Sequence, residues 1–462
     1  MNSFDVVIIG GGIAGLSAAY ELHKRGVSFQ SLEAAPRPGG VILTEEIDGF
    51  TIDAGPDALL IQKPAAATLC RELGLGDRLF PTRQPRKAYI LRSGRLHPLP
   101  ESSILGIPRD VGALAATRLF SLAGKARMAA EIVVPRRHDA VEDESIASFI
   151  GRRFGREAVT YLAEPLLAGI HAGDVDRLSM RALFPRFLQA EQRYGSVLRA
   201  FRQIGQRPSK DGAFLSLPRG LNEIVVALVG SLPAGSLRCN APVDRIDGFA
   251  PYTVHVRGGE AVTGRAVILT TPAYVAADLL EGLAPSAAAL CREVPYASSA
   301  TVALAYPRDA VRNPLVGSGF VIPRVERTAI MAGSWVSSKW PHRAPDGQVL
   351  LRAYIGGARD PGALERSDAE LQAAAEADFG AILGISGRPV LARVYRWERA
   401  NAQHEVGHLQ KVAAIEAHLK DRPGLFLTGS GVRGVGIPDC VADARATAAA
   451  VAEFVGRRQT SP

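Results

Sequence analysis

The sequence predicts an α/β fold, in which a parallel sheet binds a dinucleotide beside a mixed α+β part and a mostly helical insertion. Three observations predict this fold. A buried strand, a glycine-rich turn and a helix occupy residues 5–24. Residues 111–206 have helical periodicity with few β-branched runs. A second strand, glycine turn and helix follow residue 424, so both ends of the chain would join one sheet.

The first strand and turn carry a dinucleotide-binding pattern. Val6–Ile9 is a continuous apolar run, as expected for a parallel strand that is buried on both faces. Gly10, Gly12 and Gly15 follow as G-x-G-x-x-G. The first glycine permits the tight bend, the second lets the backbone approach a pyrophosphate, and the third lets the helix lie close to the sheet. The helix expected over 13–24 then directs its N-terminal amides at the phosphates.

An acidic residue completes the pattern. Glu33 stands at the end of a second apolar strand, 28–32, where a carboxylate can accept hydrogen bonds from ribose hydroxyls. Because the strand, the helix and the acid all occur in the expected order, a glycine turn without a ligand is the disfavoured alternative.

Two further glycine-containing segments follow the acid. The first ends in Arg37-Pro-Gly-Gly40, and the second is the loop 53–57, Asp-Ala-Gly-Pro-Asp. Arg37 alone would be interpreted as a surface cation, but in this series it is expected near the phosphates. The series resembles the FAD-containing amine oxidase and phytoene desaturase superfamily, in which all three segments line one FAD. The resemblance therefore implies a Rossmann-like FAD-binding domain of the amine-oxidase type.

Composition indicates an ordinary globular protein of about three domain equivalents. The chain has 462 residues, with 54 Lys and Arg against 46 Asp and Glu, a net charge of +8. Without a concentrated basic block, this charge is weak support for nucleic-acid binding, so no nucleic acid is expected. The basic clusters at 135–138 and Arg152–Arg153 are expected to be solvated surfaces.

The cysteines and the start of the chain indicate a cytoplasmic protein, or one on the cytoplasmic face of a membrane. Cys70, Cys239, Cys291 and Cys440 are scattered without C-x-x-C spacing, which favours buried thiols over disulfides. No run approaches the ~20 apolar residues of a spanning helix. The first strand begins at Asp5, so we expect no targeting leader.

The order of the elements predicts a chain that leaves the cofactor-binding part and returns to it twice. We expect FAD-binding parts at 1–85, 211–295 and 396–462, a substrate and helical region at 86–210, and a substrate-binding sheet at 296–395.

Six segments spread over the chain are similar to the oxygen-dependent, FAD-containing porphyrinogen oxidases. They are Gly10–Gly15, 168–174 (Ala-Gly-Ile-His-Ala-Gly-Asp), Phe184-Pro185, 217–222, Gly407-His408, and 434–440 (Gly-Val-Gly-Ile-Pro-Asp-Cys). The resemblance implies a haem-biosynthesis enzyme that oxidises protoporphyrinogen IX to protoporphyrin IX or, as the alternative, coproporphyrinogen III to coproporphyrin III. Either reaction removes six hydrogens in three flavin cycles, using three O2 and giving three H2O2, while the protein supplies orientation and excludes water.

The resemblance also implies site residues. Those expected to touch FAD are Gly10, Gly11, Gly12, Ile13, Ala14, Gly15, Glu33, Ala34, Arg37, Gly40, Gly55, Pro56, Asp57, Ala58, Val243, Trp397, Gly429, Val435, Gly436 and Ile437. Those expected at the substrate are Gly169, Arg109 and Val321.

Two of the substrate residues need separate comment. Gly169 would leave room for the macrocycle, so that a larger side chain would block binding; the alternative is a helix C-cap. The family's carboxylate-binding arginine is missing from the loop 102–106, and Arg109 is the nearest cation, with Arg86 and Lys87 as alternatives.

The segment His404-Glu405-Val406-Gly407-His408 matches the H-E-x-x-H zinc motif, yet no metal is expected. The motif requires a helix that places both histidines on one face. Gly407 costs about 1 kcal/mol in a helix relative to alanine.

Cys440 is expected to be a packed thiol rather than a nucleophile. No residue is identified as a general base.

Three alternatives and several partners stay open. Another flavin amine oxidase or a carotenoid desaturase would share the fold, although residues 432–434 offer no aromatic to pair with Trp397. A non-catalytic flavoprotein is the third reading. The family also suggests a homodimer, hand-over of product to ferrochelatase, and peripheral membrane contact through the amphipathic stretch 114–132, which could instead cover the substrate pocket.

Overall fold

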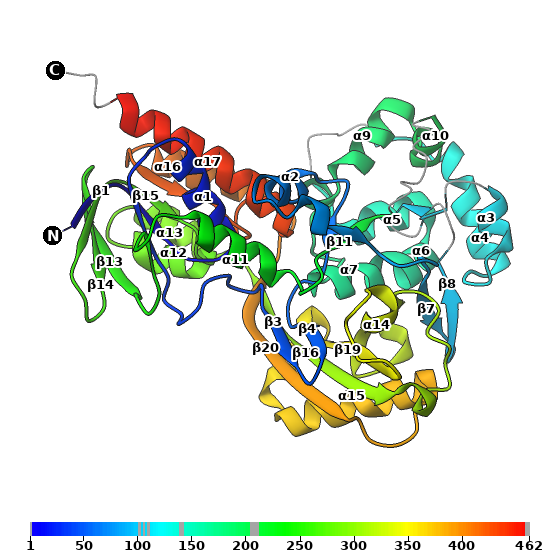
Figure 1. The fold of residues 1–462 in the computed structure, drawn as a ribbon. Helices are drawn as coiled ribbons and strands as arrows, with labels where there is room; N and C mark the ends of the chain where they lie inside the picture. Colours follow the sequence, from blue (N-terminus) through cyan, green and yellow to red (C-terminus); the bar gives the residue numbers. More distant parts are fainter. Residues whose placement is uncertain are drawn as a thin grey trace.

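The computed structural model describes residues 2–99, 103–104, 107–108, 111–137, 143–203 and 212–457. Figure 1 shows three regions: a sheet flanked by helices that contains both chain ends, a cluster of helices beside it, and a second sheet below both. No helix within these ranges is long and apolar enough to cross a membrane.

The first region is built on a mostly parallel sheet with strand order β12-β2-β1-β15-β14-β13, and with β21 paired to β15. Apolar residues on both faces make this sheet central: Val6, Val7 and Ile8 are fully buried. The strands are β1 (Asn2–Ile9), β2 (Phe29–Leu32), β12 (Leu237–Arg238), β13 (Val243–Gly248), β14 (Tyr252–Val256), β15 (Val262–Leu269) and β21 (Leu425–Leu427).

Helices cover both faces of this sheet. One apolar core joins it to α1 (Ile13–Lys24), α2 (Ala65–Glu72), α11 (Asn222–Ser231) and α17 (Ile437–Arg457). A second core joins it to α12 (Ala273–Leu280), α13 (Pro285–Arg292) and α16 (His408–Leu419). The region is therefore a three-layer α/β structure, and α1 spans the residues that the sequence predicts.

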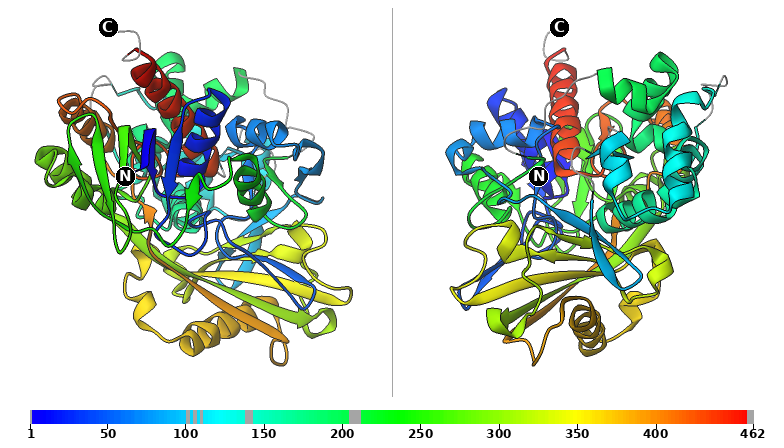
Figure 2. Two further views of the ribbon diagram at one scale, coloured as in Figure 1. Left: turned by 60° about the vertical axis from the view of Figure 1, so that its left-hand side comes forward. Right: turned by 90° about the vertical axis from the view of Figure 1, so that its right-hand side faces the viewer.

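A second sheet carries the strand order β20-β16-β19-β18-β17-β7-β8. Its strands are β7 (Ala88–Arg92), β8 (Arg95–Pro98), β16 (Tyr296–Pro307), β17 (Gly319–Val321), β18 (Ile330–Trp335), β19 (Gln348–Gly356) and β20 (Leu391–Ala402). Helix α15 (Asp368–Leu383) packs on one face through Leu371, Ala375 and Phe379. Figure 2 shows this helix on the side turned away from the first region. The opposite face is therefore the one available for a site between the regions.

Several short elements lie outside the two large sheets. They are β3 (Thr44–Ile47), β4 (Phe50–Asp53), β5 (Leu59–Leu60), β6 (Phe80–Pro81), β9 (Ser103–Ile104), β10 (Ile107–Pro108), β11 (Phe214–Ser216) and α14 (Val336–Lys339). The expected domain boundary at 395/396 falls inside β20, because this strand runs from the second sheet toward the first.

The third region contains the helices that the sequence predicts between 111 and 206. They are α3 (Val111–Ala116), α4 (Leu122–Ala129), η2 (Ala130–Val133), α5 (Ile146–Phe154), α6 (Arg156–Ala158), a π-helical turn η3 (Val159–Ala163), α7 (Glu164–His171), α8 (Met180–Leu183), α9 (Pro185–Tyr194) and α10 (Val197–Gln203). Phe149, Phe187 and Phe201 form its aromatic centre, with edge-to-face ring contacts.

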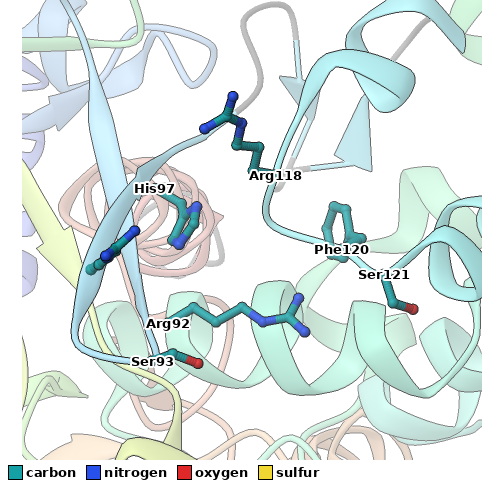
Figure 3. A pocket seen from close by; sticks show the side chains of 7 residues that line it. Arg92, Ser93, His97, Arg118, Phe120 and Ser121 are labelled. Carbon is teal, nitrogen blue, oxygen red and sulfur yellow. The ribbon is translucent and has the colours of Figure 1, made fainter.

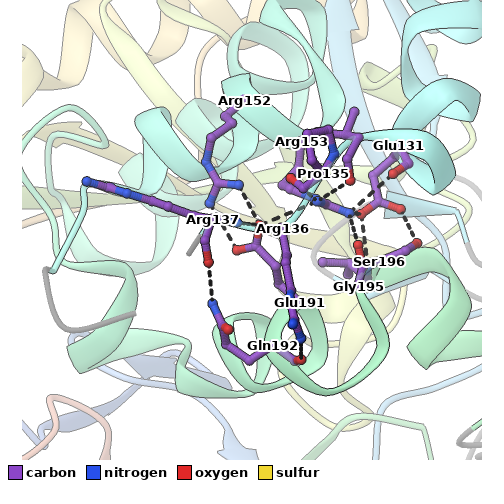
Figure 4. A network of polar contacts seen from close by, with 12 residues as sticks. Glu131, Pro135, Arg136, Arg137, Arg152, Arg153, Glu191, Gln192, Gly195 and Ser196 are labelled. Carbon is purple, nitrogen blue, oxygen red and sulfur yellow. Dashed lines mark hydrogen bonds and ion pairs between the residues drawn. The ribbon is translucent and has the colours of Figure 1, made fainter. Parts of the chain in front are cut away.

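Arg152 and Arg153 are not the solvated pair that the sequence suggests. Arg153 is fully buried and donates through Nε to Glu131 at 2.8 Å, while Arg152 lies 2.5 Å from Glu191 (Figure 4). Glu131 also accepts the Val197 amide at 2.8 Å. The charges are buried because these acids compensate them, and the network ties η2, α5, α9 and α10 together.

The amphipathic stretch 114–132 is interrupted rather than one helix. Leu114, Phe120 and Met128 point into the helical core, whereas Leu122 is 85% exposed. Most of its apolar surface is therefore already covered by the protein itself.

Candidate active site

The glycine-rich turn has the shape that a pyrophosphate needs. Gly10 has a φ of +110°, a conformation that favours glycine. A Cβ at Gly15 would lie 1.9 Å from the Gly10 carbonyl oxygen, so helix and strand touch there. A Cβ at Gly12 would meet nothing within 4 Å, and Gly12 is the N-cap of α1 without a side-chain cap. The start of this helix therefore combines unpaired amides with open space beside Gly12, which fits a bound phosphate group.

Glu33 is held directly against the turn. Its Oε2 accepts the Gly11 amide at 2.5 Å and its Oε1 accepts the Ala35 amide at 2.8 Å. Each carboxylate oxygen keeps a further acceptor position, so the predicted contact with ribose hydroxyls is compatible with this geometry. Val243 starts β13 near the same point, since the Ala241 amide donates to the Glu33 carbonyl at 2.9 Å.

Arg37 braces the second glycine pair. Its guanidinium donates to the carbonyls of Gly40 at 2.8 Å and Ile42 at 3.1 Å, and the Gly39 amide donates to the Gly11 carbonyl at 2.8 Å. The two glycine segments thus lie side by side, with Ala34 between Glu33 and this loop. Contact between Arg37 and a phosphate stays a prediction.

The Ala54–Gly55 loop is fixed by the second sheet. The Ala54 carbonyl accepts Trp397 Nε1 at 3.2 Å and Thr301 Oγ1 at 2.7 Å, and the Gly55 carbonyl accepts Arg352 Nη1 at 2.8 Å. These donors come from β20, β16 and β19. The loop expected to touch FAD, which continues through Pro56 and Ala58, is therefore positioned by the sheet expected to bind substrate.

Asp57, in the same loop, is surrounded by hydrogen-bond donors from α14, Trp340 and β19. Its carboxylate lies 2.8 Å from Lys339 Nζ, 3.0 Å from Trp340 Nε1 and 3.4 Å from Arg352 Nη2. Burial alone would raise the pKa of Asp57, but Lys339 and Arg352 hold it well below its usual range. The carboxylate is therefore ionised and serves to neutralise two buried cations.

The C-terminal glycine turn meets the first one. Gly429, at the end of β21, has a φ of +112°, and a Cβ there would lie 3.7 Å from the Ala14 Cβ. Further along, Val435 and Gly436 lead into α17 at Ile437, and Asp439 of this helix pairs with Lys63 at 2.6 Å. The C-terminal turn thus lies beside the start of α1, and contact of both segments with one FAD stays a prediction.

Cys440 is a packed thiol. It is 5% exposed, its Sγ lies 3.7 Å from the Gly434 carbonyl, and burial raises its pKa to about 12. A thiol with that pKa is protonated at neutral pH, so it is a poor nucleophile.

The structure brings Gly169 and Val321 together. A Cβ at Gly169 would lie 3.4 Å from Val321 Cγ1 and 3.5 Å from Ala332 Cβ. The helix C-cap is Ala172, with a φ of +51°, so the interpretation of Gly169 as a C-cap is wrong. Helix α7 instead uses Gly169 to approach β17 and β18. Arg109, the third predicted substrate residue, lies outside the described residues; Arg86 donates to the Thr82 carbonyl at 2.9 Å.

Sequence reasoning missed a polar group on the same face of the sheet. Tyr354 pairs with Ala332, and Arg352 pairs with Ser334, so the four side chains share the face that α7 approaches. The Tyr354 hydroxyl accepts Arg352 Nε at 2.9 Å and lies 3.2 Å from Ser334 Oγ. The signal was present, because an arginine inside the apolar strand 349–356 is unusual unless it has a buried partner.

His171 is the second residue that sequence reasoning assigned no role. Its ring packs edge-on to Phe184 with centroids 6.5 Å apart, and its side chain is only partly covered. Burial, followed by the charge of Lys63, lowers its pKa to about 4. The imidazole is therefore neutral at neutral pH, and its protonated form is disfavoured.

The zinc-like motif lacks the helix that it would need. Only His408 lies in α16; Gly407 is its N-cap with a φ of +89°. The rings of His404 and His408 stack instead, and their Nε2 atoms lie 2.8 Å from the carbonyls of Ser430 and Val432. Among the residues that the structure describes, no three His, Cys, Asp or Glu side chains group as a metal site.

Known proteins resemble the chain over almost its whole length. The model of the flavin containing amine oxidoreductases matches residues 13–452. The coproporphyrinogen III oxidase of Bacillus subtilis (strain 168) is 36% identical, covering 96% of each chain. The chloroplastic protoporphyrinogen oxidase of Nicotiana tabacum is 30% identical, covering 98% of this chain and 86% of its own. A crystal structure from Exiguobacterium sp. 255-15 superimposes with a TM-score of 0.87 at 31% identity, covering 98% of this chain and 99% of that one.

Proposed function

The chain belongs to the flavin containing amine oxidoreductases and binds FAD, and from this premise we propose that it oxidises a porphyrinogen, with coproporphyrinogen III as the preferred substrate. One geometric observation carries the reaction class. The sheet face that fixes the Ala54–Gly55 loop also carries Val321 and Ala332, which Gly169 of α7 approaches. These three residues form the patch at Gly169. A flat, apolar macrocycle needs an apolar surface of this kind next to the flavin.

Relatives support the choice of substrate. Four bacterial relatives named coproporphyrinogen III oxidase, from B. subtilis, Staphylococcus aureus, Propionibacterium freudenreichii and Mycobacterium bovis, are 36%, 32%, 31% and 34% identical. The plant relatives named protoporphyrinogen oxidase, from N. tabacum and Arabidopsis thaliana, are 30% and 31% identical. Protoporphyrinogen IX, which the sequence suggests first, is therefore the second candidate.

The chain's own residues would bind and orient the substrate. The bound flavin supplies the two-electron oxidation, and O2 is the proposed acceptor, giving H2O2. Trp397, Thr301 and Arg352 hold the cofactor loop rigid. The Tyr354 hydroxyl accepts a hydrogen bond from Arg352, so its own proton can be directed at the substrate.

Proton removal is the remaining requirement of the reaction. Each oxidation step releases protons from a porphyrinogen, and a neutral imidazole can accept one. His171 is neutral, but burial makes its imidazole a weak base, and two residues along α7 from Gly169 it projects from a different face of the helix. None of the described residues is therefore assigned as the proton acceptor.

The experiment uses FAD-loaded protein in air with coproporphyrinogen III or protoporphyrinogen IX, following porphyrin fluorescence and H2O2 against an enzyme-free control. Faster oxidation of coproporphyrinogen III supports the proposal. Faster oxidation of protoporphyrinogen IX would contradict the proposed substrate and support the second candidate function, oxidation of protoporphyrinogen IX. Acceleration of neither would overturn the function and leave an amine oxidase, a desaturase or a non-catalytic flavoprotein. A homodimer, membrane contact and transfer to ferrochelatase stay predictions.

A further inference from the structure

A pocket of basic side chains lies at the edge of the second sheet, away from the flavin loops. It is a cavity of about 490 Å³ between the β7–β8 hairpin and the loop that leads into α4 (Figure 3). Arg92 comes from β7, Arg95 and His97 from β8, and Arg118 from the loop. The side chains that line it include no acidic residue.

The positive charge in this pocket is only partly compensated. Arg92 lies 3.8 Å from Glu157 Oε2 and over the ring of Tyr161, 4.3 Å from its centroid. Arg95 and Arg118 are exposed and make no ion pair with any described residue. Two arginines therefore line one cavity without an ion-pair partner in the described part of the chain.

The pocket is separate from the patch at Gly169. Along the sheet, Val321 pairs with Ile90, and Ile90 pairs with His97. Ile90 is fully buried and packs in one core with Phe120, which is 5% exposed. This apolar layer stands between the patch and the pocket. The pocket is thus outside the site proposed for the porphyrinogen and does not depend on that proposal.

We infer that this pocket is an anion-binding site for a phosphate group, carried by a free phosphate or by a lipid headgroup. A guanidinium fork binds phosphate oxygens in pairs, and the donors here line the cavity from three chain segments. A tetrahedral group presents oxygens in several directions, whereas a carboxylate presents two in one plane. A phosphate monoester also carries about −1.5 to −2 charges, which matches the two uncompensated arginines.

The first experiment titrates inorganic phosphate into the FAD-loaded full chain at low ionic strength by calorimetry. FAD occupies the glycine turn, so phosphate cannot report on that site. The variant is Arg95→Gln with Arg118→Gln. The control is Arg388→Gln, an exposed arginine before β20 at the opposite edge of the sheet. We expect saturable binding that weakens by about tenfold or more in the double variant, is unchanged in the control, and weakens with added salt.

The second experiment separates the two sources. Phosphatidylcholine vesicles with or without phosphatidic acid are sedimented with the same proteins. Binding that needs phosphatidic acid and is lost in the double variant assigns a lipid headgroup; phosphate binding without vesicle binding assigns a free phosphate. An Arg95→Lys, Arg118→Lys variant should keep part of the binding, which excludes misfolding as the cause. Equal binding by wild type and the glutamine variant, or binding of neither probe, would overturn the inference.

Discussion

The imidazole rings of His404 and His408 stack with centroids 3.8 Å apart and planes 11° apart. Each ring donates from Nε2 to a backbone carbonyl, His404 to Ser430 and His408 to Val432. The pair therefore holds the start of α16 against the turn that precedes residues 435–437, which are expected to contact FAD. Burial lowers the pKa of both imidazoles, which favours neutral rings, and two stacked imidazolium ions would also repel each other.

Stability should fall as the solution becomes acidic. Burial, followed by the neighbouring His408, lowers the pKa of His404 from 6.5 to about 3. Between these values the unfolded chain binds more protons than the folded one, so the free energy of unfolding decreases as pH falls from 6.5 toward 3, by up to about 1.4 kcal/mol per pH unit for one histidine. Urea unfolding at several pH values measures this slope. His404→Gln should flatten it, and an unchanged slope would contradict the assignment.

Alanine substitutions at Gly12 and Gly15 should have different effects, one on FAD binding and the other on protein stability. Gly12→Ala places its methyl group in open space, so the apoprotein should unfold like wild type while its FAD content falls several-fold. Gly15→Ala forces a methyl group to 1.9 Å from the Gly10 carbonyl and should destabilise the apoprotein itself. Visible absorbance of bound flavin and thermal unfolding of the apoprotein separate the two effects. Equal FAD content in Gly12→Ala and wild type would mean that the phosphates lie elsewhere.

Substitution of Gly169 should lower kcat/KM for the porphyrinogen and leave FAD binding unchanged. A leucine there would push against Val321 and Ala332, so we expect kcat/KM to fall on the order of a hundredfold with unchanged FAD content. Gly169→Ala adds one methyl group at ordinary contact distance and should be milder. Gly230→Leu, on the exposed side of α11 with nothing within 4 Å, is the control. Steady-state kinetics with the preferred porphyrinogen would reveal a normal kcat/KM if the patch is not the substrate site.

Removing the acid beneath Arg153 should unfold the helical region first. Glu131→Gln removes the nearer of two counter-charges from the fully buried Arg153 guanidinium and leaves Glu191 at 3.4 Å, so we expect a loss of about 3 kcal/mol, the lower end of the cost of breaking a buried ion pair. Glu46→Gln removes one partner of a mostly exposed pair with Arg219 and should change the free energy of unfolding by less than about 1 kcal/mol. Denaturant titration followed by near-ultraviolet circular dichroism compares them. Similar losses in both variants would show that Glu131 is not the essential counter-charge.

The elements with a strong local signal were predictable from the sequence. The helix at 13–24 appears as expected, because apolar periodicity acts over a few residues. The return of the chain to the first sheet was also predicted, from the order of the elements. In the structure, Thr270 follows β15 of that sheet, and its Oγ1 lies 3.0 Å from the Gly10 carbonyl.

Contacts between distant segments were not predictable. Nothing near Arg153 in the sequence shows that Glu131 and Glu191 neutralise it, so it resembled a surface cation. In the sequence, Arg352 and Tyr354 belong to an ordinary strand. Only the pairing of this strand with β18 shows that they lie beside Ser334 and Ala332. Such groups are recognised only when the register of the sheet is known.

The pairing of β1 with β15 has a consequence for how the protein is made. Val6 pairs with Ala266, and β21 adds to β15 only at Leu425–Leu427. The glycine turn therefore leaves the ribosome long before the strands that complete its sheet. Pairings this distant along the chain form slowly, and the early strands expose apolar surface meanwhile. We therefore expect capture of the flavin to follow the emergence of β21 from the ribosome.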